Sequence, residues 1–159
     1  MLSEEKPQTG WFEHSEGEKR RGCVLFLEDE LSHRTQWNVF FTEAGWDVYS
    51  FATVEDAIEV LDNGDHWGKI DVAVLDYSLK GSAINGLEFA RTVQERSDSR
   101  IQAMVLTGEA QAISHRDTLH QTREGRIAEF LTKDCPKEEL LDALDRLQRT
   151  ADMRRRYLD

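Results

Sequence analysis

Five short aliphatic runs recur along the chain, and a segment with helical periodicity separates each run from the next. Their centres lie about 25 to 30 residues apart, the size of a strand–helix unit. The runs occupy residues 22–28, 46–51, 70–76, 101–107 and 127–132. Near-continuous apolar runs are typical of parallel strands covered on both faces. The pattern therefore predicts an α/β fold, a three-layer α/β/α sandwich around a five-stranded parallel sheet in the order 2-1-3-4-5.

The segments between the runs carry apolar residues at helical spacing. Helices are predicted at 30–44, 53–63, 86–96, 110–124 and 136–150, of which 110–124 has the weakest stripe. Thr53 stands where it can cap the second helix. The chain of 159 residues suits one domain, placed at 22–150. Residues 1–21 are expected to form a flexible arm carrying Trp11-Phe12, and residues 151–159 a helical extension or tail.

Composition narrows the classes of function. A formal net charge of -11 repels nucleic acid phosphates, so no direct nucleic-acid binding is expected. The longest apolar stretch has five residues, which is too short to span a membrane. Cys23 and Cys135 lack metal-site spacing and are expected at opposite ends of the sheet, where they cannot form a disulfide. These features favour a reducing compartment, the cytoplasm.

Polar side chains close four of the five aliphatic runs. Glu28-Asp29, Asp76, Thr107 and Lys133 follow the first, third, fourth and fifth runs. Because parallel strands end at the same edge of a sheet, these groups are expected to converge where open α/β sheets bind ligands. The carboxylates can hold Mg²⁺, and Asp76 can act as a nucleophile toward phosphorus. Thr107 and Lys133 can hold phosphoryl oxygens.

These motifs resemble the receiver domain of two-component response regulators, the CheY-like superfamily. The resemblance covers about 22–150 and rests on Val24–Glu30, Val72–Asp76, Val105–Gly108 and Phe130–Lys133. It implies that Asp76 is the phospho-acceptor and that Mg²⁺ is held by Glu28, Asp29, Asp76 and the backbone carbonyl of Ser78. It also implies that Thr107 and Phe130 are switch residues and that Lys133 pairs with the phosphate.

The chain departs from the family pattern at three places. Lys80 replaces the usual proline four residues after Asp76, and Gly86 comes ten residues after it rather than eight, so the loop 78–85 is longer. Asp134 follows Lys133 where the family has a proline, often in a cis bond, which puts the local geometry in question. The stretch from Thr107 to Lys133 is also a few residues longer than is typical.

The leading hypothesis is a stand-alone receiver, phosphorylated on Asp76 by a histidine kinase or phosphotransfer protein and not a turnover enzyme. The helix 4–strand 5–helix 5 face would then contact a partner or a second copy, or the phosphate would pass onward in a relay. A phosphorylation-independent binding module is the alternative. A haloacid-dehalogenase-like hydrolase is disfavoured because Ser78 stands where its second aspartate belongs. Favourable placement at a helix C-terminus explains part of the arginine content of 146–156. These arginines are also candidates for contact with an acidic partner or with the acidic face of the domain itself.

Overall fold

The computed structural model describes residues 9–108 and 127–158. The strands are β1 (Gly10–Phe12), β2 (Gly22–Leu27), β3 (Trp46–Phe51), β4 (Val72–Asp76), β5 (Gln102–Thr107) and β6 (Glu129–Thr132). The helices are α1 (Leu31–Glu43), α2 (Val54–Asp62), the short 3₁₀ helix η1 (Trp67–Lys69), α3 (Gly86–Ser97) and α5 (Lys137–Leu158). All five predicted strands are present within two residues of their expected bounds. The helix predicted at 110–124 lies outside the described residues.

The sheet has six strands in the order β1-β3-β2-β4-β5-β6, one more than predicted. Strands β2 to β6 are mutually parallel, whereas β1 pairs antiparallel with β3. Part of the expected flexible arm is thus an edge strand. Its two aromatic residues explain why, because successive strand residues face opposite sides. Trp11 packs on Tyr49 with ring centroids 4.7 Å apart. Phe12 packs on the opposite face of the sheet, against the buried cluster that contains Phe26 and Phe41.

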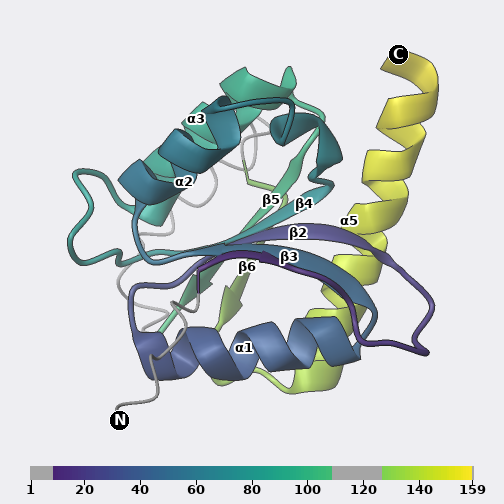
Figure 1. Cartoon of the computed structure of the whole chain (residues 1–159), viewed down its shortest axis with the longest axis horizontal. Coiled ribbons are helices and arrows are strands. Elements are labelled where there is room, and N and C mark those ends of the chain that lie inside the picture. Colours follow the sequence, from purple (N-terminus) through teal and green to yellow (C-terminus); the bar gives the residue numbers. More distant parts are fainter. Residues whose placement is uncertain (1–8, 109–126, 159) are drawn as a thin grey trace, which may run out of the picture.

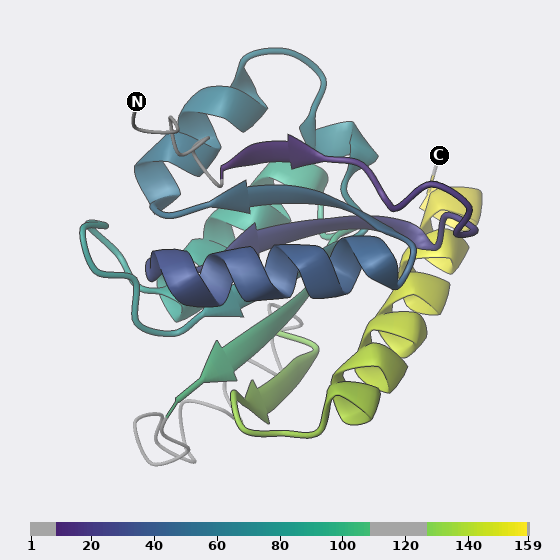
Figure 2. The same cartoon turned by 60° about the horizontal axis from the view of Figure 1, so that its bottom comes forward.

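Helices cover both faces of the sheet (Figure 1). Helices α2 and α3 lie on one face, and α1 and α5 lie on the other, as the turned view in Figure 2 also shows. One buried cluster joins Leu25, Phe51 and Phe89 under α2 and α3, and a second joins Phe26, Phe41 and Leu144 under α1 and α5. Strands β2 and β4 contribute to both clusters, as expected for strands with two apolar faces.

Helix α5 runs 22 residues without a break, so most of the expected extension continues the last helix. Arginines near its end hold it to the domain. Arg155 donates from Nε to Asp71 Oδ1 at 2.9 Å and from Nη2 to the Gly68 carbonyl at 2.9 Å, and Arg154 donates to the Ser99 carbonyl. Of the two alternatives for the arginine-rich end, contact with the domain itself therefore holds for these two residues.

Two further expectations can be compared with the described residues. Cys23 and Cys135 are free thiols, and Cys23 is buried in β2 whereas Cys135 follows β6. The Thr53 side chain accepts a hydrogen bond from the Asp56 N–H and caps α2 as predicted. Among the described helices, none is both long and apolar enough to cross a bilayer.

Candidate functional site

A pocket of about 410 Å³ opens at the carboxyl edge of the sheet, where β2, β4, β5 and β6 end. Its lining residues come from the last residues of β4 and β5 and from the loops that follow the four strands. They are Glu28, Asp29, Glu30, Asp76, Tyr77, Ser78, Lys80, Thr107, Gly108 and Lys133. All five side chains that end predicted strands therefore meet in one place, together with Ser78.

Lys133 joins the two most buried carboxylates of the pocket. Its Nζ lies 2.8 Å from Glu28 Oε1 and 3.0 Å from Asp76 Oδ2. Glu28 is 1% exposed and Asp76 4% exposed. Lys133 is half-buried, and the two carboxylates that accept its hydrogen bonds offset the cost of removing its ammonium from water. Burial lowers the pKa of Lys133, but hydrogen bonds to Glu28 and Asp76 outweigh it and raise that pKa, so the ammonium stays charged.

Three carboxylates gather around the same point. Ligand oxygens of Glu28, Asp29 and Asp76 all lie within 4.8 Å of one another. Burial, reinforced by the nearby Glu28, raises the pKa of Asp76 to about 7 although Lys133 opposes the rise. Burial acts in the same direction on Glu28, but hydrogen bonds with Asp76 and Lys133 leave its pKa below the ordinary value. The cluster thus carries negative charge that one ammonium does not balance.

A divalent cation fits this cluster. Mg²⁺ prefers oxygen ligands at about 2.1 Å in an octahedron, so ligand oxygens around it lie about 3 to 4 Å apart. The Glu28, Asp29 and Asp76 oxygens lie within 4.8 Å of one another, a bound that allows this spacing. A doubly charged ion would also favour the ionised form of Asp76, which the neighbouring carboxylate disfavours. The donor set and the electrostatics therefore both suit Mg²⁺.

Arg34 contacts the backbone of the acidic pair Glu28-Asp29, and it was not among the residues predicted for the site. It lies in α1, is 5% exposed and donates from Nη1 to the Glu28 carbonyl at 2.8 Å. Burial lowers the pKa of Arg34, and the charges of Glu28 and Asp29 oppose this. Arg34, Asn38 and Phe41 are the buried residues of α1 and are spaced at i, i+4 and i+7. The pattern of apolar residues in α1 did not indicate that Arg34 is buried, because a charged residue is expected on the solvent-facing side of a helix.

The longer loop after Asp76 is attached to the start of α2. The Val54 N–H donates to Ser82 Oγ at 3.0 Å, and the Ala83 N–H donates to Glu55 Oε1 at 2.8 Å. Leu79 is buried within the loop. These contacts hold the loop in place, so the extra length extends toward α2 and leaves Ser78 and Lys80 on the pocket wall.

Gly86 begins α3 against the end of β4. A Cβ at this position would lie 2.1 Å from the Asp76 carbonyl oxygen, so only glycine allows this approach. Asn85 and Glu88 form a capping box that fixes the start of the helix. The close contact with the Asp76 carbonyl and the capping box together fix where α3 starts after the loop.

The remaining predicted residues lie on β5 and β6. Thr107 ends β5, is buried and lines the pocket, and its carbonyl accepts a hydrogen bond from the Lys133 N–H at 2.8 Å. Phe130 is half-buried in β6 and packs against the core cluster under α2 and α3. All described peptide bonds are trans, including Lys133–Asp134. Lys133 thus reaches both carboxylates without the proline that the family usually has.

The sequence matches the family model of the response regulator receiver domain over residues 24–145. This match spans most of the chain, and the protein belongs to the receiver-domain family of two-component signalling. A search of curated proteins found no match.

Solved structures share the fold at low sequence identity. The receiver domain of an HD domain-containing protein from Pseudomonas fluorescens has a TM-score of 0.71 at 16% identity, with 88% of this chain and 96% of that chain covered. A CheY-like receiver domain from Methanospirillum hungatei has a TM-score of 0.67 at 15% identity, covering 83% and 98%. NtrX from Brucella abortus, in complex with ATP, has a TM-score of 0.71 at 16% identity, covering 86% of this chain. Our chain spans only 29% of that NtrX chain.

Proposed function

We propose that this receiver accepts a phosphoryl group on Asp76 from a phosphohistidine of a sensor kinase or phosphotransfer protein. The observation that carries the proposal is the placement of Lys133 Nζ between Glu28 Oε1 and Asp76 Oδ2, beside a third carboxylate from Asp29. This arrangement supplies a nucleophile, a cation and a ligand set for Mg²⁺ in one open pocket. These are the parts that phosphoryl transfer requires.

In the proposed reaction a carboxylate oxygen of Asp76 attacks the phosphorus atom in line with the phosphorus–nitrogen bond. That bond breaks, the imidazole leaves with its electron pair, and a new oxygen–phosphorus bond forms on Asp76. Mg²⁺ held by Glu28, Asp29, Asp76 and the Ser78 carbonyl would neutralise charge on the phosphoryl oxygens. Lys133 keeps its bond to Glu28 and turns its free N–H groups toward the phosphoryl oxygens.

Signalling is proposed to follow from the new charge on Asp76. The Thr107 hydroxyl would move to donate to a phosphoryl oxygen, and Phe130 would change its packing against the core. Phe130 is suited to this role because it is half-buried on an outer strand of the sheet. The resulting surface would contact a partner protein or pass the phosphate onward. The proposed location of this exchange is the cytoplasm.

The experiment is incubation of the protein with acetyl phosphate and Mg²⁺, followed by intact-mass measurement. One phosphoryl group should be added to the native chain and none to Asp76→Asn. Asp65→Asn is the matched control, because Asp65 is an exposed carboxylate outside the pocket. If neither acetyl phosphate nor a phosphorylated histidine donor modifies the native chain, the phosphorylation-independent binding module becomes the better interpretation.

A further inference from the structure

A second pocket lies at the opposite, amino-terminal side of the sheet, between residues 18–21 and α5. It encloses about 470 Å³, within the range of small-molecule sites. Its lining cations are Lys19, Arg20, Arg21 and Arg149, and its lining carboxylates are Glu18 and Asp145. The four positive and two negative lining side chains, together with Asp47, which pairs with Arg20, carry a formal charge of +1 on a protein whose net charge is -11. Positive charge is therefore concentrated here against the overall balance.

Two of these cations already have carboxylate partners. Arg20 donates from Nε to Asp47 Oδ2 at 2.7 Å, and Arg21 Nη1 lies 3.2 Å from both carboxylate oxygens of Asp145. Within the described part of the chain, each pair leaves other guanidinium N–H groups without a carboxylate. Such groups are suited to a ligand with several oxyanions.

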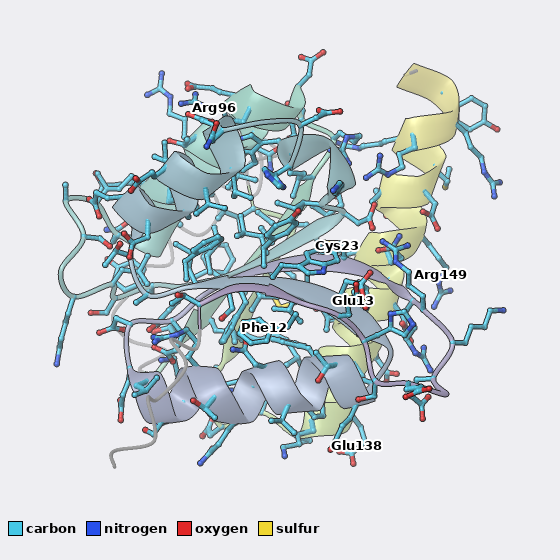
Figure 3. All side chains as sticks on the ribbon, in the orientation of Figure 1. Phe12, Glu13, Cys23, Arg96, Glu138 and Arg149 are labelled. Carbon is cyan, nitrogen blue, oxygen red and sulfur yellow. The ribbon has the colours of Figure 1, made fainter. Side chains whose placement is uncertain are left out.

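Lys19 and Arg149 supply the excess positive charge of the pocket, against one remaining lining carboxylate, Glu18. Within residues 9–108 and 127–158, neither side chain forms an ion pair, and Arg149 uses Nε only for the Asp145 backbone carbonyl at 3.3 Å. They extend from opposite walls of the pocket. Figure 3 shows Arg149 on the part of α5 beside the segment that leads into β2. An anion between these walls would meet one cation from each.

The wall that carries Lys19 is held in place by backbone contacts. The Ser15 N–H donates to the Thr42 carbonyl at 2.9 Å, and the Arg21 N–H donates to the Gly45 carbonyl at 2.7 Å. Gly45 has a φ of +100°, and a Cβ there would lie 2.5 Å from the Lys19 carbonyl oxygen. The backbone of Lys19 therefore packs closely on the α1–β3 turn, which reduces the entropy lost when an anion binds.

We propose that this pocket binds a small anion bearing phosphate groups, such as a diphosphate or a phosphate ester. Guanidinium forks match phosphate oxygens in geometry, and the lysine adds a compact positive charge. The pocket volume exceeds what a single phosphate would fill, so a ligand with at least two anionic groups fits best. The site does not involve Asp76 or its pocket. A negative result for anion binding would therefore leave the phosphorylation proposal unaffected.

The test is calorimetric titration with inorganic pyrophosphate in Mg²⁺-free buffer at constant ionic strength. Saturable binding is expected, and Lys19→Gln and Arg149→Gln should each weaken it about fivefold or more. Arg156→Gln is the matched control, since it removes the same charge from an exposed position on the same helix outside the pocket. This control should change the affinity by less than about twofold, because solvent and salt screen distant charges.

Amide chemical-shift mapping in the same titration locates the ligand. Shifts should concentrate on residues 18–21 and 145–149 and should be small around Lys133. Binding that does not saturate, that maps to the Lys133 pocket, or that weakens equally in Arg156→Gln would overturn the proposal. Co-sedimentation with phosphatidylglycerol vesicles distinguishes a lipid headgroup from a free anion. Whether the ligand is a lipid headgroup or a free anion, unchanged binding to both Lys19→Gln and Arg149→Gln would refute the proposed site.

Discussion

Replacement of Gly86 by alanine tests whether close backbone contact behind Asp76 supports the site. A Cβ at Gly86 would lie 2.1 Å from the Asp76 carbonyl oxygen, 2.9 Å from its carbonyl carbon and 3.4 Å from Leu75 Cβ. The atoms that must move belong to the backbone of β4. Gly86 cannot easily retreat either, because its N–H donates to the Tyr77 carbonyl at 3.0 Å and Asn85 caps the helix.

Two effects of opposite sign compete in this substitution. Helix propensity favours alanine over glycine by about 1 kcal/mol. A carbon–oxygen contact normally needs about 3.3 Å, so the carbonyl must retreat by about 1 Å, and overpacking of this kind costs about 1–3 kcal/mol. Because backbone atoms absorb the displacement, we expect the upper part of that range and a net destabilisation of about 1–2 kcal/mol. The melting temperature should fall by about 2–4 °C for each kcal/mol.

Urea unfolding followed by tryptophan fluorescence measures this difference. Gly108→Ala is the control, because a Cβ there meets no atom of the described residues within 4 Å although Gly108 lines the same pocket. Transfer from acetyl phosphate should also slow in Gly86→Ala, since the displaced carbonyl belongs to Asp76. A Gly86→Ala protein that is at least as stable as the native chain and is phosphorylated at the native rate would refute the reasoning.

Three further predictions follow from the charged contacts. Burial raises the pKa of Asp47, but hydrogen bonds from Arg20 and His14 outweigh it and lower that pKa. Asp47 therefore stabilises the fold above about pH 4, and this contribution is lost as the pH falls further, so the stability of Asp47→Asn should depend less on pH in that range in urea titrations. Mg²⁺ should raise the melting temperature of the native chain but not of Asp76→Asn, and equal stabilisation of both would argue against a metal site there. Arg155→Met should destabilise the protein by about 1–3 kcal/mol in urea, because it removes a partner of the buried Asp71, and an unchanged midpoint would contradict that role.

Much of the site could be predicted because its residues follow strands directly. Asp76 and Thr107 end β4 and β5, and Lys133 comes one residue after β6. Parallel strands place the residues at their carboxyl ends along one edge of the sheet, independently of the conformation of the connecting loops. The Lys80 and Gly86 departures were visible in the sequence, but their outcome was not. The extra loop residues attach to α2 through Ser82 and Glu55, contacts between segments about 28 residues apart.

Other features had no readable signal in the sequence. Trp11-Phe12 stood within a polar segment, and a three-residue strand is too short for its alternation to be distinguished from a loop. Arg34 reads as a solvent-facing residue of α1, yet it is buried against the Glu28 carbonyl. The end of α5 carries Arg154, Arg155 and Arg156 and was expected to be a helical extension or a tail, but its contact with the domain was not readable, because Arg155 bonds to Asp71 across 84 residues.

The amino-acid sequence alone determined the alternating elements and the residues that close each strand, because periodicity and strand ends are local properties of the chain. Only the tertiary structure decided which polar groups are buried and paired. Lys133 lies 105 residues from Glu28 and 57 from Asp76 in the sequence, yet the folded chain places one ammonium between both carboxylates. The distances that give these groups their charge state arise from packing distant segments together, and packing of that kind leaves no pattern within any single segment.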